Sequence, residues 1–435
     1  MAHFFPDYRS WMRAVTDTRQ QDLITYPRQF LLWMGLMIFL LKLQSRRRVR
    51  FELDSPAALV NINRLSGTEQ ETMAHSDTIE HFLGHVPLAA LETLRHQGVQ
   101  RLIRMKVLDG GRLQTHLLVG VDGTGQLSFG TRRHCAHCLT KKVEGTVYYY
   151  HHVLEAKLVT PDGLAISLGS ESIENSDSKA KDPKTRKQDC ELKAFGRLAK
   201  RLRRQYPQLR LCLLLDALYA NGTAMQICQQ NHWKYITTFK PGSLPSQWQE
   251  YQSLQALCPW AIKKVSESDT RPGQVFRWVN DLRHLDDQKR EHRFAAFQCQ
   301  ERDQDGTEHL FAWLTNFRVD AATVANLANR GGRCRWKIEN EGFNIQKNGG
   351  FNLEHAYSTK HIKHWYILLQ IAHTILQLME RGSLLSAPCK KLFGSLWNLA
   401  RRLAESLRHF LIPLEALDLR AAAAIQIRLN PLDSS

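Results

Sequence analysis

The sequence lacks several features that would place it in other classes. Its longest apolar run, Phe30–Leu41, has 12 residues, whereas a membrane span needs about 20. No small-residue cleavage site follows it, which argues against a signal peptide. We therefore expect a buried core helix at this run and no membrane partner. Nine cysteines, an odd number scattered over a long chain, exclude a secreted disulfide framework and favour the reducing cytosol.

The chain also has fewer acidic than basic residues. It contains 42 Asp and Glu and 59 Lys and Arg, which gives a net charge of +17. Such an excess usually serves a polyanion, either nucleic acid or an anionic membrane. With the membrane disfavoured, nucleic acid is the expected partner. A length of 435 residues at 43% hydrophobic content predicts two or three domains with cores of their own.

A second C-x-x-C motif is also missing. The single one, Cys135 and Cys138 in "HCAHC", is flanked by histidines, and His151 and His152 follow. These residue types can bind zinc, but a structural zinc site normally needs a second pair of ligands at similar spacing. We expect a pair of reduced thiols and keep zinc as the alternative.

The first 110 residues have helical periodicity throughout. Within them, residues 77–105 form two amphipathic stretches separated by a Gly-x-x-Pro break. Ordinary helix packing is the favoured interpretation, and a helix-turn-helix that reads DNA is the alternative. The basic segment Lys42–Arg50 suits either the end of the apolar helix or a phosphate backbone.

The periodicity then changes to two. Strands are predicted over Leu113–Asp122, Gly145–Val159 and Gly163–Ile173, as an antiparallel meander. A polar loop, 174–189, precedes a helix over 190–205 that Asp189 would cap. The apolar run Leu209–Asn221 predicts a central strand that ends in one aspartate.

After a further helix and strand, aromatic-rich strand candidates between residues 241 and 318 predict a β-rich insertion, and the remainder is helical. This order of elements matches an α/β fold with a ribonuclease-H-like mixed sheet, in which the first and fourth strands are parallel neighbours. The predicted units are a helical amino-terminal domain (1–110), the first part of the core (111–240), the β-rich insertion (241–318), the last core helix (319–350) and a helical carboxyl-terminal region (351–435).

Two aspartates on neighbouring strands predict a metal site. Asp122 ends the first predicted strand and Asp216 the fourth. Carboxylates held that close repel each other unless a cation lies between them, which favours Mg²⁺. Glu339 in "RWKIENEG" would complete the site, because at helical spacing it shares a face with Arg335. Glu341 is the fallback.

On this helix Phe343 is expected on the face of Glu339. Trp336 and Ile338 lie on the flanking faces and are expected to pack on the sheet.

The segments "LLVGVDGTG", "LCLLLDALYAN" and "RWKIENEGFNIQKN" resemble the DDE-type transposases of bacterial insertion sequences, and "TRKQDCELKAF" and "NLEHAY" add to the likeness. The resemblance implies two Mg²⁺ or Mn²⁺ ions. Asp122 would bridge both ions, and Asp216 and Glu339 would each hold one. Of the family signature Tyr-x2-Arg-x3-Glu-x6-Lys, anchored on Glu339, the arginine matches Arg335.

The other two signature positions depart from the family. Gly332 stands at the tyrosine and Gln346 at the lysine, with Lys347 one place late. The resemblance implies that Arg335 and Lys347 contact the phosphate backbone, and Lys347 is expected to substitute for the family's lysine because a flexible ammonium tolerates a small offset.

The resemblance further implies a cytoplasmic, nucleoid-associated bacterial enzyme that acts on terminal inverted repeats and target DNA as a DNA-bound homodimer. Lys184, Arg186 and Lys187, with the basic face of the 190–205 helix, are expected to follow backbone phosphates, and a solvated helix face is the alternative. Two other functions stay open: a ribonuclease-H-like nuclease or resolvase, and a DNA-binding protein derived from a transposase.

Overall fold

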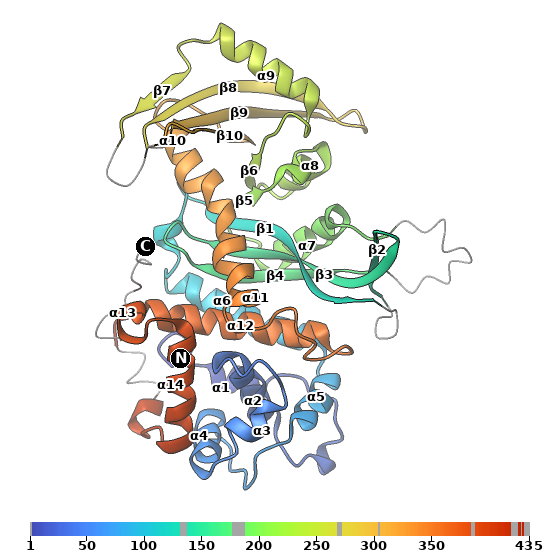
Figure 1. The fold of residues 1–435 in the computed structure, drawn as a ribbon, viewed down its shortest axis with the longest axis vertical. Coiled ribbons are helices and arrows are strands. Elements are labelled where there is room, and N and C mark those ends of the chain that lie inside the picture. Colours follow the sequence, from blue (N-terminus) through green and yellow to red (C-terminus); the bar gives the residue numbers. More distant parts are fainter. Residues whose placement is uncertain are drawn as a thin grey trace, which may run out of the picture.

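The computed structural model describes residues 2–130, 137–175, 188–267, 272–302, 305–383, 388–418, 425–427 and 429. It is a mixed α/β protein with helices at one end of the long axis and a ten-stranded mixed sheet in the rest (Figure 1). Cys135, Lys184, Arg186 and Lys187 lie outside the described residues, so their predicted roles stay predictions.

The helical end is built from both ends of the chain. The amino-terminal helices are α1 (Tyr8–Arg13), α2 (Arg28–Leu40), α3 (Arg48–Glu52), α4 (Pro56–Ser66), α5 (Ser76–Gly84) and α6 (Leu88–Arg104). The carboxyl-terminal helices are α12 (Ile362–Arg381), α13 (Cys389–Phe393) and α14 (Leu396–His409). Asn61 of α4 donates its amide to carbonyls at the end of α14, at Leu407 and Phe410. The two termini therefore share one helical layer (Figure 1).

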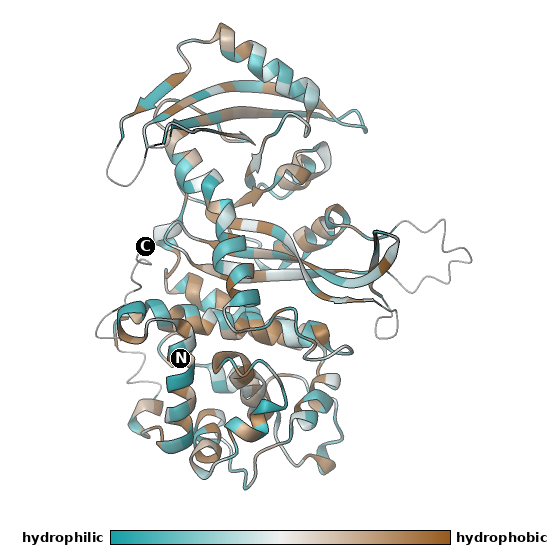
Figure 2. Ribbon diagram, viewed as in Figure 1, coloured by the Kyte–Doolittle hydropathy of each residue, from teal (hydrophilic) through white to brown (hydrophobic). Residues whose placement is uncertain are grey.

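The apolar run predicted to be a core helix is confirmed. Every residue of α2 from Phe30 to Leu40 is buried among the other helices of this end (Figure 2). Within the described ranges, no helix combines the length and the apolarity that crossing a bilayer requires.

The sheet contains strands from all of the central chain. They are β1 (Leu117–Phe129), β2 (Leu139–Val143), β3 (Thr146–Val159), β4 (Ala165–Ile173), β5 (Leu211–Leu215), β6 (Lys234–Thr238), β7 (Ile262–Val265), β8 (Gln274–Leu285), β9 (Glu291–Arg302) and β10 (Glu308–Thr315). Their order is β2-β3-β1-β5-β6-β10-β9-β8-β7, and β4 also pairs with β3. Helices α7 (Glu191–Gln205), α8 (Gly222–Gln230) and α9 (Pro245–Leu257) connect them.

The predicted meander of β1, β3 and β4 is confirmed as antiparallel, and β5 lies parallel beside β1. The prediction that the first strand ends at Asp122 is wrong. Strand β1 continues to Phe129, because the long strand β3 offers partners for its backbone groups that far. With β2, which was not predicted, the outer parts of these strands form a projection past α7 (Figure 1), here named the β arm: residues 123–129, 139–143 and 146–152.

The β-rich segment predicted over 241–318 contains β7 to β10 and also α9. Strand β10 pairs with β6, with Thr315 opposite Ile236, so these strands extend the central sheet rather than forming a separate one. The division of the chain into domains stays a prediction.

The segment with Glu339 is a helix of irregular pitch that crosses the sheet in front of β1 (Figure 1). It runs through α10 (Val324–Asn326), a π turn (Leu327–Gly331), a 3-10 turn (Gly332–Arg335), a second π turn (Ile338–Asn344) and α11 (Ile345–Asn348). Ile338 is fully buried and lies against Gly120 of β1, where a Cβ would approach it to 3.1 Å. The predicted packing of Ile338 on the sheet is thus confirmed.

A buried polar network joins the sheet to α12. Glu155 and Lys157 of β3 are both fully buried, 3.7 Å apart. Tyr366 donates its hydroxyl to Glu155 at 2.9 Å, and the Lys157 ammonium donates to the Gln370 amide oxygen. Burial lowers the pKa of Lys157 to about 8, although the Glu155 charge opposes this. Loss of one member of the network would therefore leave a charged side chain without its partner in the core.

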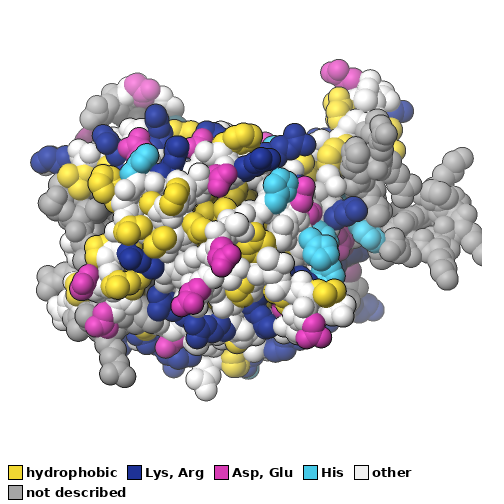
Figure 3. All heavy atoms as spheres, turned by 90° about the horizontal axis from the view of Figure 1, so that it is seen from below, with side chains coloured by type: hydrophobic (Ala, Val, Ile, Leu, Met, Phe, Trp, Pro, Cys, Tyr) yellow, Lys and Arg dark blue, Asp and Glu magenta, His cyan; other side chains and the backbone are white. Residues whose placement is uncertain are grey.

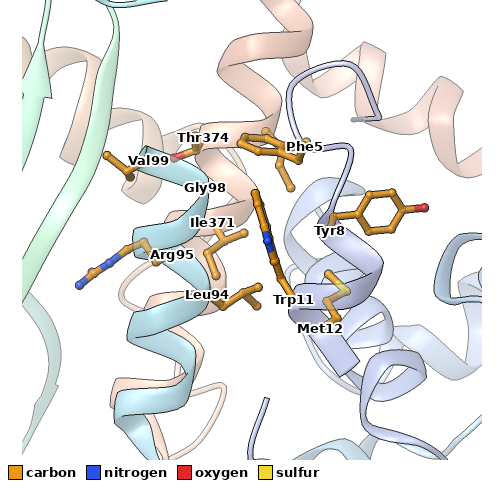
Figure 4. A pocket seen from close by; sticks show the side chains of 11 residues that line it. Phe5, Tyr8, Trp11, Met12, Leu94, Arg95, Gly98, Val99, Ile371 and Thr374 are labelled. Carbon is orange, nitrogen blue, oxygen red and sulfur yellow. The ribbon is translucent and has the colours of Figure 1, made fainter. Parts of the chain in front are cut away.

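Arg95 of α6 also belongs to this network. Its aliphatic stem borders a crevice between α1, α6 and α12, while its guanidinium turns toward the sheet (Figure 4) and donates to Ser170 at 2.8 Å. The crevice has a volume of about 40 Å³, which is comparable to one water molecule. It therefore reflects the packing of the amino terminus against α6 and α12.

Replacing Glu155 by Leu should destabilise the fold by about 3–5 kcal/mol, because it leaves the Lys157 ammonium buried without its carboxylate. Urea unfolding followed by tryptophan fluorescence measures this. The double variant Glu155→Leu/Lys157→Met is the control and should be more stable than the single variant. Equal stability of the two would contradict the charge-pair account.

Candidate functional site

Asp122 and Asp216 stand at matching positions of two neighbouring parallel segments. Gly120 of β1 is opposite Leu214 of β5, and each aspartate comes two residues later in the sequence. Asp122 continues within β1, whereas Asp216 follows the last residue of β5 and accepts the Leu218 amide at 2.9 Å. The predicted adjacency of the first and fourth strands thus brings both aspartates to the same level of the sheet.

Arg335 links Asp122 to Glu339. Its Nη1 lies 3.4 Å from Asp122 Oδ2 and 2.9 Å from Glu339 Oε1, and the residue is only 8% exposed. The Gly123 amide donates to Asp122 Oδ1 at 2.9 Å. Burial and a hydrogen bond with Glu339 raise the pKa of Asp122 to about 7, although Arg335 opposes the rise. The carboxyl groups of Asp122 and Glu339 therefore share the positive charge of Arg335.

Glu191 is a fourth acid that the sequence analysis did not single out. Its Oε1 lies over Gly123, where a Cβ would approach it to 2.4 Å, so a larger residue at this position would displace the Glu191 side chain. Tyr219 donates its hydroxyl to Glu191 Oε2 at 3.4 Å. Burial, and then the charge of Asp216, raise the pKa of Glu191. Glu191 thus belongs to the electrostatic environment of the aspartates.

The sequence signal for Glu191 was its place as the first residue of α7, two residues after Asp189, which was predicted to cap the helix. That interpretation of Asp189 is wrong. The N-cap residue is Cys190, and Asp189 instead accepts two hydrogen bonds from Arg197, the shorter at 2.6 Å. A bidentate guanidinium binds a carboxylate more strongly than a helix amide does.

The donor chemistry of the acids suits a hard divalent cation, because carboxylate oxygens are the ligands that Mg²⁺ prefers. Among the described residues, however, no three His, Cys, Asp or Glu side chains are arranged so that they could hold one ion. The Arg335 guanidinium instead compensates Asp122 and Glu339. The predicted three-acid metal site therefore stays a prediction.

The one-place offset of Lys347 has a structural cause. A π turn spans Ile338–Asn344, and an i→i+5 turn takes about one residue more than an α turn. The eighth residue after Glu339 therefore reaches the angular position that the seventh would reach in a regular α-helix. That residue is Lys347, which this turn places on the face of Glu339.

The contacts of the two neighbours agree with this register. Gln346 is fully buried and donates to Gln370 and His373 of α12 at 2.9 and 3.0 Å. Lys347 pairs with Glu354 at 2.8 Å and is close enough to His152 to add to the lowering of its pKa, after burial. His152 Nδ1 in turn lies 3.9 Å from Glu191, so Lys347 belongs to the side of the acids.

Two further predictions for this helix have different outcomes. Trp336 does not pack on the sheet: it is 51% exposed, and the Arg335 guanidinium lies 4.2 Å from its ring. The 3-10 turn before it rotates the indole outward while Ile338 takes the buried position. Glu341 pairs with Lys337 at 3.2 Å and is not part of the contact between Asp122 and Glu339.

Part of the basic surface is already neutralised. Arg197 and Arg201 of α7 bind Glu171, and Arg201 also binds Glu92 at 2.6 Å. At the helical end, Lys and Arg side chains are spread among acidic and hydrophobic ones (Figure 3). The predicted phosphate-tracking role of these surfaces stays a prediction. Cys138 is buried and disulfide-bonded, so the expectation that it carries a reduced thiol is wrong. Cys135, the other residue of the possible zinc site, lies outside the described residues.

Replacing Asp122 by Asn should change the pH dependence of stability. The pKa of Asp122 is raised in the folded state, so the folded chain binds the proton more tightly and its stability falls as pH rises from about 4 to 7. The variant lacks this fall and should exceed the natural chain at pH 8 by on the order of 2–4 kcal/mol. Urea unfolding at pH 5 and pH 8 tests this, with the exposed Asp22→Asn as control. Parallel pH curves for the natural chain and Asp122→Asn would refute it.

The register of the irregular helix is tested by Gln346→Lys, which restores the family's lysine at its usual spacing. An ammonium at this fully buried position, in the same network as Lys157, should destabilise the fold by about 3 kcal/mol or more. Lys347→Ala, at a partly exposed ion pair, should change stability by less than about 1 kcal/mol. Thermal and urea unfolding measure both. A Gln346→Lys variant as stable as the natural chain would contradict the burial of residue 346 in this network.

The site thus combines paired aspartates, a glutamate on a crossing helix, a bridging arginine and an additional buried glutamate. No protein-family model matches the chain, and no curated protein matches it.

Proposed function

We propose that this chain is a DNA transposase of the DDE type, which cuts strands at element ends and joins them to target DNA. The observation that carries the proposal is the meeting of Asp122 with Glu339, 217 residues apart in sequence, beside Asp216 on the parallel strand. The strand order β4-β3-β1-β5-β6, with β1 and β5 parallel, supports a ribonuclease-H-like core.

In this proposal Asp122, Asp216 and Glu339 hold two Mg²⁺ or Mn²⁺ ions. When bound, such ions activate a water or a 3′-hydroxyl and stabilise the leaving oxygen. The raised pKa of Asp122 favours a bound cation, since a cation stabilises the ionised carboxylate more than one shared guanidinium does. The carboxylate oxygens are therefore the ligand type that the proposed ions prefer, whereas the described side chains are not arranged so that three of them hold one ion.

The basic residues of the irregular helix then act on the substrate. Asp122 and Glu339 would hold such an ion, whose charge would replace the compensation that Arg335 provides, and the Arg335 guanidinium would then be available for a backbone phosphate. Lys347, on the same face as Glu339, supplies a second cation for that strand. Glu191, with the Tyr219 hydroxyl, fixes the surroundings of Asp216 from the side of α7.

The charge of the whole chain agrees with a DNA substrate. A net charge of +17 attracts a polyanion at long range, and this attraction weakens as salt rises. We propose that water first cuts the strand at an element end and that the freed 3′-hydroxyl then attacks target DNA at the same site. Joining two ends to one target implies two copies of the chain on the DNA.

The test incubates the chain with labelled DNA ends, taken from the inverted repeats flanking its gene, in the presence of Mg²⁺. Alanine at Asp122, Asp216 or Glu339 should lower cutting and joining by more than about 100-fold, because a ligand loss exceeds the effect of losing an outer partner. The matched control is Glu341→Ala, an acid of the same helix that pairs with Lys337, and it should keep most activity.

The products separate the candidate functions. Joined strands support a transposase, and cutting without joining supports a nuclease or resolvase. Binding without either reaction would support a DNA-binding protein derived from a transposase and would overturn the proposed chemistry.

A further inference from the structure

An exposed indole lies beside the acids on the irregular helix. Trp336 is 51% exposed, and the Arg335 guanidinium lies 4.2 Å from the centre of its ring. The same guanidinium contacts Asp122 at 3.4 Å and Glu339 at 2.9 Å. A single side chain therefore separates a solvent-exposed ring from both carboxyl groups.

Exposure alone does not give this ring a role, because scattered apolar side chains are common on protein surfaces. Phe51 on α3, Trp260 between α9 and β7, and Phe410 after α14 are exposed to an even larger extent. Trp336 is singled out by its position, since its ring contacts a side chain that also contacts the acids. Its position, rather than its exposure, points to the substrate of the candidate site.

Three asparagines continue the exposed side of the helix. Asn340, Asn344 and Asn348 follow Trp336 at steps of four residues, and all four side chains are exposed. Residues four apart lie on the same side of a helix. We name these four residues the outer face. Asn is a weak helix former, so helix stability does not explain this row, whereas an amide that both donates and accepts hydrogen bonds suits a polar ligand.

The outer face adjoins the face that carries the acids. Arg335 and Glu339 each precede a member of the outer face by one residue, Trp336 and Asn340. A ligand on the outer face is therefore next to the carboxyl groups without displacing them. The Arg335 guanidinium covers the indole from the side of the acids, and the exposed part of the ring is open to a second flat group.

We propose that the outer face binds an unpaired nucleotide next to the phosphate on which the acids act. Its base stacks on the indole of Trp336, and the amides of Asn340 and Asn344 form hydrogen bonds with the adjoining strand. In a duplex each base is already covered by its neighbours, so paired DNA cannot use the ring in this way. The proposal rests on the proposed function, since it names the part of the DNA that lies beside the acids.

Three labelled DNAs test this by fluorescence anisotropy, with the full chain in EDTA. One duplex ends in a single unpaired nucleotide, the second has the same nucleotide without its base, and the third is fully paired. Trp336→Ala should weaken binding of the first by about tenfold and of the third by less than about twofold. The natural chain should bind the second about tenfold more weakly than the first, and Trp336→Ala should not weaken it further, because ring and base form one contact.

Trp336→Phe keeps a ring and should recover most of the lost affinity, and thermal unfolding checks that each variant is folded. The matched control is Trp260→Ala, which removes an exposed indole elsewhere and should leave all three affinities unchanged. Additive losses from removing the ring and the base would overturn the proposal. Equal losses for paired and unpaired DNA after Trp336→Ala would also overturn it, because the ring would then serve only to hold Arg335.

A second pair of variants tests the asparagines. Asn340→Asp places a negative charge on the outer face and should weaken binding of the DNA with the unpaired nucleotide, because the charge repels its phosphates. Asn326→Asp, at an exposed position of α10 in the same crossing segment, is the control and should have a smaller effect. Equal effects of the two aspartates would contradict the placement of the strand on this face.

The result does not depend on cutting or joining, because EDTA removes the divalent cations. Asp216→Ala should lose cutting in Mg²⁺ but keep the same effects of ring and base on binding. If these effects are found and the natural chain does not cut DNA in Mg²⁺, the nucleotide site stands and the proposed chemistry fails. If the natural chain cuts and joins without them, the nucleotide site alone is wrong.

Discussion

The candidate site depends on one electrostatic constraint, the compensation of carboxylates that the sheet brings together. Parallel pairing of β1 with β5 places Asp122 and Asp216 at the same level, and the crossing helix adds Glu339 to Asp122. Uncompensated charges at such distances repel strongly when they are partly buried. Arg335 and the proton that Asp122 retains supply the compensation within the chain. In the proposed function, a bound cation would compete with Arg335 for the same carboxylates.

Packing against the sheet and against α12 sets the position of Glu339. The irregular helix has Ile338 against Gly120 on one side and Gln346 against α12 on the other, and α12 is itself tied to Glu155 and Lys157 of β3. Hydrogen bonds of this buried kind fix orientation more than they add stability. Helix α12 thus helps to position Glu339 through its contact with Gln346.

The sequence was most informative where hydrophobic period and strand order decide structure. The apolar run at α2, the buried strand β5 and the meander around β3 could be predicted because one-dimensional patterns report burial directly. It was least informative where contacts between residues distant in sequence determine the local structure. The extension of β1 past Asp122 depends on the length of β3, the outward turn of Trp336 depends on a 3-10 turn, and the recruitment of Glu191 depends on a glycine that leaves room for it.

Both departures from the transposase signature trace to the backbone of one helix. Gly332, at the place of the tyrosine, has no side chain because the Trp313 indole of β10 fills that space, where a Cβ would approach it to 2.4 Å. Gln346, at the place of the lysine, turns into the core because the preceding π turn adds a residue, and the same addition returns Lys347 to the side of Glu339. A pattern of fixed spacings assumes a regular helix. When the pitch changes, a residue reaches a given face of the helix at a different spacing, so a mismatch in spacing alone does not decide which residue lies on that face.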